Sequence, residues 1–146
     1  MCGMKKFVTG VSFLALFALA CVSTLFAPST PTPTPTPPPA GTDLHTELPP
    51  GDPVRGELLF IGSFACSACH GVFEGQVTTC PNIVGLSERA ATRVPGYSAV
   101  QYLRESIVSP DAYVVDEYAA GVMPQNFGET MNTQQLADIL AFLMTK

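Results

Sequence analysis

The chain has 146 residues, among them 14 prolines and 12 glycines, so it has room for one modest domain and some sequence without a packed core. Its formal net charge of −5 argues against binding to nucleic acid. All twelve acidic residues lie beyond Thr42, together with five of the seven basic ones, since Lys5 and Lys6 precede it. This acidic excess predicts docking to a basic partner, although solubility alone would also explain it.

Residues 1–27 have the pattern of an export signal or a membrane anchor. Lys5-Lys6 precedes an apolar run without charges, which extends over residues 7–27. Counted to residue 20, the run has the length of a signal-peptide core, and counted to residue 27 it is about long enough to cross a bilayer at ~1.5 Å per residue. Cys21 adds a third possibility, because the residues before it resemble a lipoprotein signal. We expect an uncleaved anchor, a lipid on Cys21, or cleavage to a free protein, and tethering is favoured.

Residues 28–50 are predicted to be a linker, because they open with an alternating Thr-Pro sequence. Proline lacks the amide donor and restricts φ, so this sequence favours an extended polyproline-type spacer. Such a spacer could reach on the order of 70 Å at ~3.1 Å per residue. Residues 51–146 are then expected to form the single folded domain.

Three helices are predicted after residue 50, and no convincing alternating strand, which indicates an all-α domain. The first begins at Asp52-Pro53, with aspartate as N-cap and proline in the first helical position. The second begins at the capping-box pattern of residues 98–101 and ends at Ser109-Pro110, and the third begins near Asn132. The apolar residues expected to face the core are Val54, Leu58 and Ile61, with Leu59 and Phe60 widening their face, and then Val100, Leu103, Ile107, Leu136, Ile139, Leu140 and Leu143.

The stretch Cys66-Ser67-Ala68-Cys69-His70 follows the first helix and is the signature of covalent haem attachment. Each cysteine can add across one vinyl group, and the adjacent histidine can then reach the iron through Nε2. A zinc site would need a second ligand pair, whereas only Cys80 remains downstream and His45 lies in a proline-rich run. A thioredoxin-like pair would be expected near a βαβ pattern, and a simple structural disulfide is the remaining alternative.

Two apolar stretches, residues 80–86 and 121–128, are interrupted by proline and glycine and are predicted to be loops that require burial. A large apolar cofactor would provide the surface against which they pack. Cys80 lies in the first of them, outside the haem motif. We expect it to be buried as a small apolar residue, and a reactive thiol or an intermolecular disulfide is the alternative.

Beyond the haem motif, further features occur in an order and spacing typical of one family. They are Gly71 directly after the motif, Pro81-Asn82-Ile83, Gly96-Tyr97-Ser98 at a helix start, Val122-Met123-Pro124, and a closing amphipathic helix. Together they resemble the class I cytochromes c from about Gly51 to Lys146. Residues 102–115 look especially like the monohaem domains attached to bacterial respiratory and photosynthetic membrane complexes. The resemblance implies a small all-α fold of about three to five helices around one covalent haem c.

The resemblance also implies roles for single residues. His70 would be the proximal ligand of the iron and Met123 the distal one, because Met131 and Met144 lack the flanking glycine and proline of the Met123 loop. Pro81 resembles the position whose carbonyl accepts the Nδ1 proton of the proximal histidine.

Further positions resemble structural contacts of the family. The terminal helices would cross through Gly56 and Phe60 on the first and Ile139 and Phe142 on the last. The chain has no tryptophan, so the propionate contact that mitochondrial members make with an indole is absent. Possible substitutes for that contact are Arg93, Arg104, Tyr97 and Tyr102.

A single-electron carrier is the function that the resemblance implies, and not an enzyme. We expect it on the outer side of the bacterial cytoplasmic membrane, held by its N-terminal segment and working with redox proteins or a membrane electron-transfer complex. Whether it would be a mobile shuttle or a permanent subunit stays open. The second hypothesis is a haem enzyme or gas sensor with an open distal site.

Overall fold

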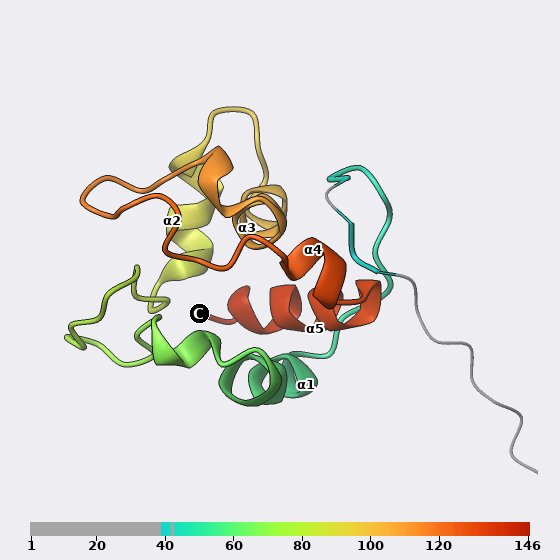
Figure 1. Ribbon diagram of the computed structural model, residues 1–146, viewed down its shortest axis with the longest axis horizontal. Coiled ribbons are helices and arrows are strands. Elements are labelled where there is room, and N and C mark those ends of the chain that lie inside the picture. The colour runs from blue at the N-terminus through green and yellow to red at the C-terminus, as the bar shows by residue number, and fades with distance from the viewer. Residues whose placement is uncertain (1–38, 42) are drawn as a thin grey trace, which may run out of the picture. The chain divides into compact units, whose positions relative to one another are not determined.

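Five α-helices follow one another in the computed structural model, which describes residues 39–41 and 43–146 (Figure 1). They are α1 (Pro53–Leu58), α2 (Leu86–Arg93), α3 (Ala99–Val108), α4 (Phe127–Thr130) and α5 (Thr133–Leu143). A π-helical turn, Leu59–Ser63, continues α1, and short 3-10 turns occur at Cys66–Ala68 and Pro110–Ala112. Within the described residues there is no β-strand, only two isolated bridges, so the predicted all-α class is confirmed.

The predicted helix starts are confirmed by their caps. The Asp52 side chain accepts hydrogen bonds from the backbone N–H groups of Val54 and Arg55, and Pro53 occupies the first helical position. Ser98 and Asn132 each form a complete capping box with a glutamine three residues later. All these signals act within one helical turn, so they can be recognised in the sequence.

Helices α2 and α4 were not predicted, for different reasons. Helix α2 begins after Gly85, which has a left-handed backbone with φ of 64° and provides no side-chain cap. Its sequence is mostly polar, so it lacks a long apolar stripe. Helix α4 has four residues and begins inside the predicted loop of residues 121–128.

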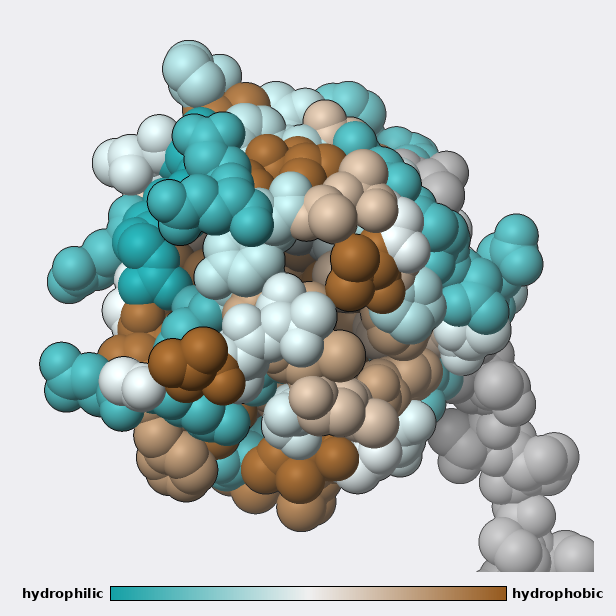
Figure 2. Space-filling view, turned by 60° about the vertical axis from the view of Figure 1, so that its left-hand side comes forward, coloured by the Kyte–Doolittle hydropathy of each residue, from teal (hydrophilic) through white to brown (hydrophobic). Residues whose placement is uncertain are grey.

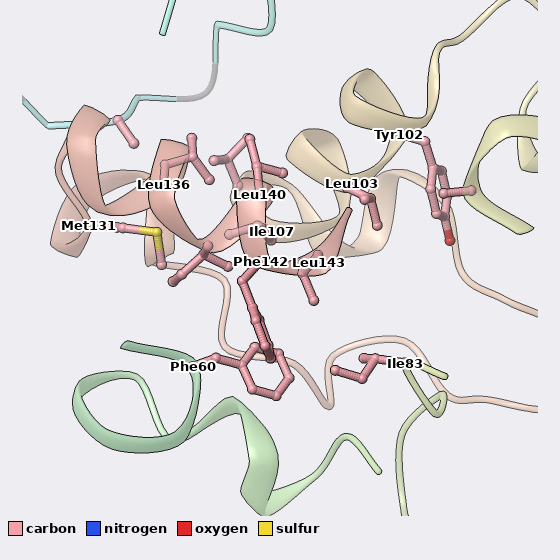
Figure 3. Packing of buried hydrophobic residues seen from close by; sticks show 14 residues of the cluster. Phe60, Ile83, Tyr102, Leu103, Ile107, Met131, Leu136, Leu140, Phe142 and Leu143 are labelled. Carbon is pink, nitrogen blue, oxygen red and sulfur yellow. The ribbon is translucent and has the colours of Figure 1, made fainter. Parts of the chain in front are cut away.

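The terminal helices α1 and α5 pack closely against each other, as the family resemblance implies. The approach requires Gly56, because a Cβ atom there would lie 2.0 Å from the carbonyl oxygen of Asp138. Next to it the rings of Phe60 and Phe142 pack with centroids 5.4 Å apart, and Figure 3 shows them facing each other from the π-helical turn after α1 and from α5. Leu136 and Ile139 are fully buried on α5, so its predicted core face is confirmed.

The predicted core face of the first helix is wrong for Val54, Leu58 and Ile61 but confirmed for Phe60, which is buried, and Leu59 packs partly buried against the core. Val54 and Leu58 are each about two-thirds exposed, at 67% and 68%, and Ile61 is also exposed. The buried side of α1 and of the π-helical turn after it is the one with Gly56 and Phe60, because only a glycine lets the backbones of α1 and α5 approach. On α3, Val100 is likewise exposed, whereas the predicted Leu103 and Ile107 are buried.

The packed part of the chain includes residues upstream of Gly51. Residues 39–50 were predicted as the end of the linker, but Ala40 is buried and Leu44 and Leu48 pack against the core. The described residues all belong to one compact unit, Pro35–Lys146. The predicted signal or anchor, residues 1–27, and the first part of the linker lie outside the described residues and stay predictions. Across the part of the chain that is described, no helix has the length and hydrophobicity needed to cross a membrane.

A buried carboxylate joins α5 to the start of α1. Asp138 accepts a hydrogen bond from the Asp52 backbone N–H at 2.8 Å and an ion-paired one from Arg55 Nε at 3.0 Å. The Gln134 side-chain amide donates a further bond at 2.9 Å. Burial alone would raise the pKa of Asp138, but these bonds to its charged form outweigh burial and lower the pKa.

We expect Asp138→Asn to lower the free energy of unfolding by about 2 kcal/mol at pH 7, because a charge-assisted hydrogen bond is lost. A carboxyl whose pKa is lowered on folding contributes stability above its unfolded pKa of about 4, and this contribution disappears as pH falls through the folded value. The difference between wild type and variant should therefore shrink below about pH 4. Urea titrations at pH 7 and pH 3 measure it, with exposed Glu57→Gln as the control. A difference that is constant with pH would contradict the prediction.

Candidate functional site

An apolar pocket lies between the loops and helices α3 and α5, and the space-filling view shows the protein surface hollowed there (Figure 2). Its walls come from segments far apart in the sequence. The lining includes Phe60, Cys66, His70, Pro81, Ile83, Tyr102, Leu103, Ile107, Tyr113, Met123, Phe127, Ile139 and Leu143. Both predicted loops contribute, which explains why apolar residues occur in proline- and glycine-rich sequence.

His70 lies at the wall of this pocket with one ring nitrogen already engaged. Its Nδ1 donates a hydrogen bond to the carbonyl oxygen of Pro81, 2.8 Å away, and its ring lies 6.4 Å from that of Phe60. Burial lowers the pKa of His70, and the Pro81 carbonyl opposes this effect without cancelling it. The neutral imidazole is therefore favoured, with Nε2 as the nitrogen available to a metal.

The two cysteines of the motif differ in their surroundings. Cys66 lines the pocket, and burial raises the pKa of its thiol to about 11, whereas Cys69 is exposed and does not line the pocket. A short turn holds the motif together, with the N–H groups of Cys69 and His70 both donating to the Cys66 carbonyl. Ala65, before the motif, has a left-handed backbone with φ of 48°.

Cys80 is the third cysteine near this site. It is buried, as predicted, and its backbone N–H donates to the carbonyl of Cys69 at 3.3 Å. Burial raises the pKa of the Cys80 thiol, and the neighbouring Cys69 adds to the increase.

Two of the three candidate methionines line the pocket. Met123 is partly buried in the loop between Gly121 and Pro124, and its role as distal ligand stays a prediction. Met131 also lines the pocket, but it is 1% exposed and packs in the core near Leu136 (Figure 3). Met144 is exposed and lies outside the pocket lining.

The residues considered for the propionates divide into two groups. Arg93 and Tyr102 line the pocket. Arg104 is engaged elsewhere, since its guanidinium binds backbone carbonyls of residues 43–46, and the Tyr97 hydroxyl faces Glu105 at 3.4 Å.

Arg89 is a pocket residue that sequence reasoning missed. It lies one helical turn before Arg93 on α2, and both line the pocket and a smaller polar hollow beside it. Arg89 donates to the carbonyls of Asn82 and Val84, whereas Arg93 has no hydrogen-bond or ion-pair partner among the described residues. The spacing of four residues indicates that the two arginines share one face of a helix, but only once residues 86–93 are recognised as helical.

The alternatives to haem attachment find no support in the described part of the chain. No group of three or more histidines, cysteines or acidic residues is placed there to hold a metal ion, as a zinc site would require. Cys66, Cys69 and Cys80 are all free thiols. The apolar hollow is thus surrounded by an imidazole with an available Nε2, a thioether and thiols. This donor set suits an iron porphyrin.

Comparisons with known proteins agree with this donor set. The family model described as Cytochrome c matches residues 54–146. The chain is 31% identical to cytochrome c2 of Rhodopila globiformis over 103 residues, which are 66% of this chain and 95% of that protein. The matched range includes all five predicted site residues, Cys66, Cys69, His70, Pro81 and Met123.

Proposed function

The chain belongs to the cytochrome c family, and we propose that it is a membrane-tethered monohaem electron carrier whose iron is held by His70 and Met123. The general part of this statement, a haem c protein that carries electrons, follows from the family itself. The ligand pair, the tether and the cellular location are the parts that we propose.

Four side chains would hold the cofactor. Cys66 and Cys69 would form the two thioether bonds, His70 would bind the iron through Nε2, and Met123 would provide its sulfur on the other axial position. The haem supplies one-electron chemistry, because its iron changes between the ferric and ferrous states. Met123 would favour the ferrous state, since a thioether ligand raises the reduction potential.

The observation that carries the ligand assignment is the hydrogen bond from His70 Nδ1 to Pro81 at 2.8 Å, made in a pocket that Met123 also lines. This bond fixes the orientation of the ring and leaves Nε2 available, as in metal sites where a second group orients a histidine ligand. With His70 and Met123 both bound to the iron, the protein would leave no position on it for oxygen or a substrate. The arrangement therefore suits electron transfer rather than bond chemistry.

An absorption spectrum of the reduced protein with and without carbon monoxide tests this function. We expect no change on adding carbon monoxide, because His70 and Met123 occupy both axial positions. Immediate and complete formation of a carbon monoxide complex would instead indicate the open distal site of a haem enzyme or gas sensor.

We place the haem domain on the outer side of a bacterial cytoplasmic membrane, joined to it by the N-terminal segment. The support is the apolar run of residues 7–27 behind Lys5-Lys6, together with Cys21 as a possible lipid site. Membrane fractionation with haem staining tests the tether. Haem protein found mainly in the soluble fraction would contradict it.

The partner is expected to be a redox protein or membrane complex with a basic surface. Residues 43–146 carry twelve acidic and five basic side chains, and this excess would attract such a surface. We expect the bimolecular rate of electron transfer to fall as ionic strength rises, because salt screens charges beyond about 8 Å at physiological strength. Stopped-flow measurements between low and high salt would show it. A rate independent of salt would indicate apolar docking instead.

A further inference from the structure

Residues 39–48, apart from Thr42, form a segment that we call the strap, and the side chain of Arg104 holds one end of it. The guanidinium donates from Nη1 to the carbonyls of Leu44 at 3.1 Å and Thr46 at 2.6 Å, and from Nη2 to that of Asp43 at 2.5 Å. Arg104 is only 5% exposed and has no carboxylate within ion-pair distance among the described residues. A buried cation is costly unless polar groups surround it, so the strap carbonyls compensate for the burial of Arg104.

The other end of the strap is bonded to the end of helix α4. Ala40 N–H donates to the carbonyl of Met131 at 2.7 Å, and Gly41 N–H donates to that of Gly128 at 2.8 Å. The last carbonyls of a helix have no partner within the helix, and α4 has only four residues. The strap therefore supplies donors that α4 cannot provide for itself.

Helix α4 in turn fixes one end of the Met123 loop. Three residues separate Met123 from Phe127, whose ring lines the pocket and packs edge-on against Phe64 at 6.0 Å. The other end of the loop is held by Asp111, which accepts a bond from Gly121 N–H at 2.9 Å. Among the described residues, the carbonyl of Met123 accepts only from the Gln125 side chain, which belongs to the same loop. The loop therefore depends on the contacts at its two ends.

We infer that the strap, held by Arg104, is a positioning element for Met123, and that Arg104 is a positioning residue for the sixth ligand. The inference rests on the proposed function, in which Met123 binds the iron. It involves residues 39–48, which lie outside the family match of residues 54–146. Loosening the strap gives α4 and the Met123 loop more freedom, so the methionine sulfur leaves the iron more often.

Imidazole binding to the iron of the ferric full-length protein measures how often the Met123 sulfur leaves the iron. We expect Arg104→Ala to lower the half-saturating imidazole concentration by about fivefold or more, because apparent affinity rises with the fraction of binding-competent protein. Arg104→Lys should restore part of the wild-type value, since a lysine can still donate to a strap carbonyl.

Gly41→Ala loosens the strap without touching Arg104. Gly41 has φ of +64°, which disfavours alanine, yet a Cβ there would meet no atom within 4 Å. We expect the same direction of change in imidazole binding, so the inference stays testable even where Arg104→Ala fails to fold. Faster hydrogen exchange at the amides of Ala40 and Gly41 provides a readout that does not depend on the iron.

Arg55→Ala is the matched control, because it removes an arginine bonded to Asp138 and leaves the strap intact. It should lower the unfolding midpoint without changing the imidazole titration. The inference is overturned when both strap variants exchange faster at the amides of residues 40 and 41 but bind imidazole as the wild type does. It is also overturned when Arg55→Ala changes imidazole binding as much as the strap variants do. Failure of the proposed function looks different, since Met123→Ala would then bind imidazole like the wild type.

Discussion

Met123→Ala is expected to keep the covalent haem but lose the weak red absorption band of the oxidised protein that depends on the sulfur ligand. The reduced variant should bind carbon monoxide, because one axial position is now open. Its reduction potential should fall by on the order of 0.1 V or more, within the roughly 0.8 V over which axial ligands set haem potentials. The physical reason is that the thioether no longer stabilises ferrous iron. Optical spectra and redox titration measure all three effects.

Met131→Ala is the matched control, because Met131 lines the same pocket but packs in the core. It should lower stability, as core truncations do, by roughly 2–5 kcal/mol, with the red band retained. His70→Ala should behave differently from both, impairing haem attachment or stable folding. A Met131→Ala protein without the band, beside a Met123→Ala protein that keeps it, would show that the ligand assignment is wrong.

Gly56→Ala is expected to be strongly destabilising, although it adds a single methyl group. The new Cβ would lie 2.0 Å from the Asp138 carbonyl oxygen and 2.6 Å from its carbon, so the backbones of α1 and α5 must separate. Backbone atoms cannot move aside as the end of a flexible side chain can, and we expect a loss of about 3 kcal/mol in the free energy of unfolding. Chemical denaturation followed by circular dichroism measures this loss.

Gly62→Ala is the control for Gly56→Ala, because a Cβ at Gly62 meets nothing within 4 Å. It lies in the π-helical turn that continues α1, so both substitutions alter a helical glycine of the same segment. We expect its effect to stay within about 1 kcal/mol. Equal losses in the two variants would show that the close approach of α1 and α5 is not what requires Gly56.

Features encoded by neighbouring residues could be predicted from the sequence. The haem motif is contiguous, and the caps at Asp52, Ser98 and Asn132 act within one turn. The exposed face of α1 could not be predicted in this way, because apolar residues occur on both of its sides. Which side is buried depends on the close approach at Gly56, and that depends on α5, more than 80 residues away in sequence.

The pocket was predictable only in part, for the same reason. His70 and Met123 carry motif or loop signals of their own, whereas Arg89 is noticed only once α2 is known to bring it beside Arg93. The role of Arg104 depends on three carbonyls that lie about 60 residues upstream. A residue of any type can offer a backbone carbonyl, so the sequence does not show which carbonyls Arg104 binds. Arg104 was therefore a candidate for the propionates.

The strap determines where this protein can be shortened or fused. A truncated version that begins at Gly51 would retain Cys66, Cys69, His70 and Met123 and would look complete by comparison with its family. It would nevertheless leave Arg104 without its carbonyl partners and the end of α4 without its donors. A shortened form should therefore start before Pro39, so that a segment of linker-like composition is kept as part of the folded domain.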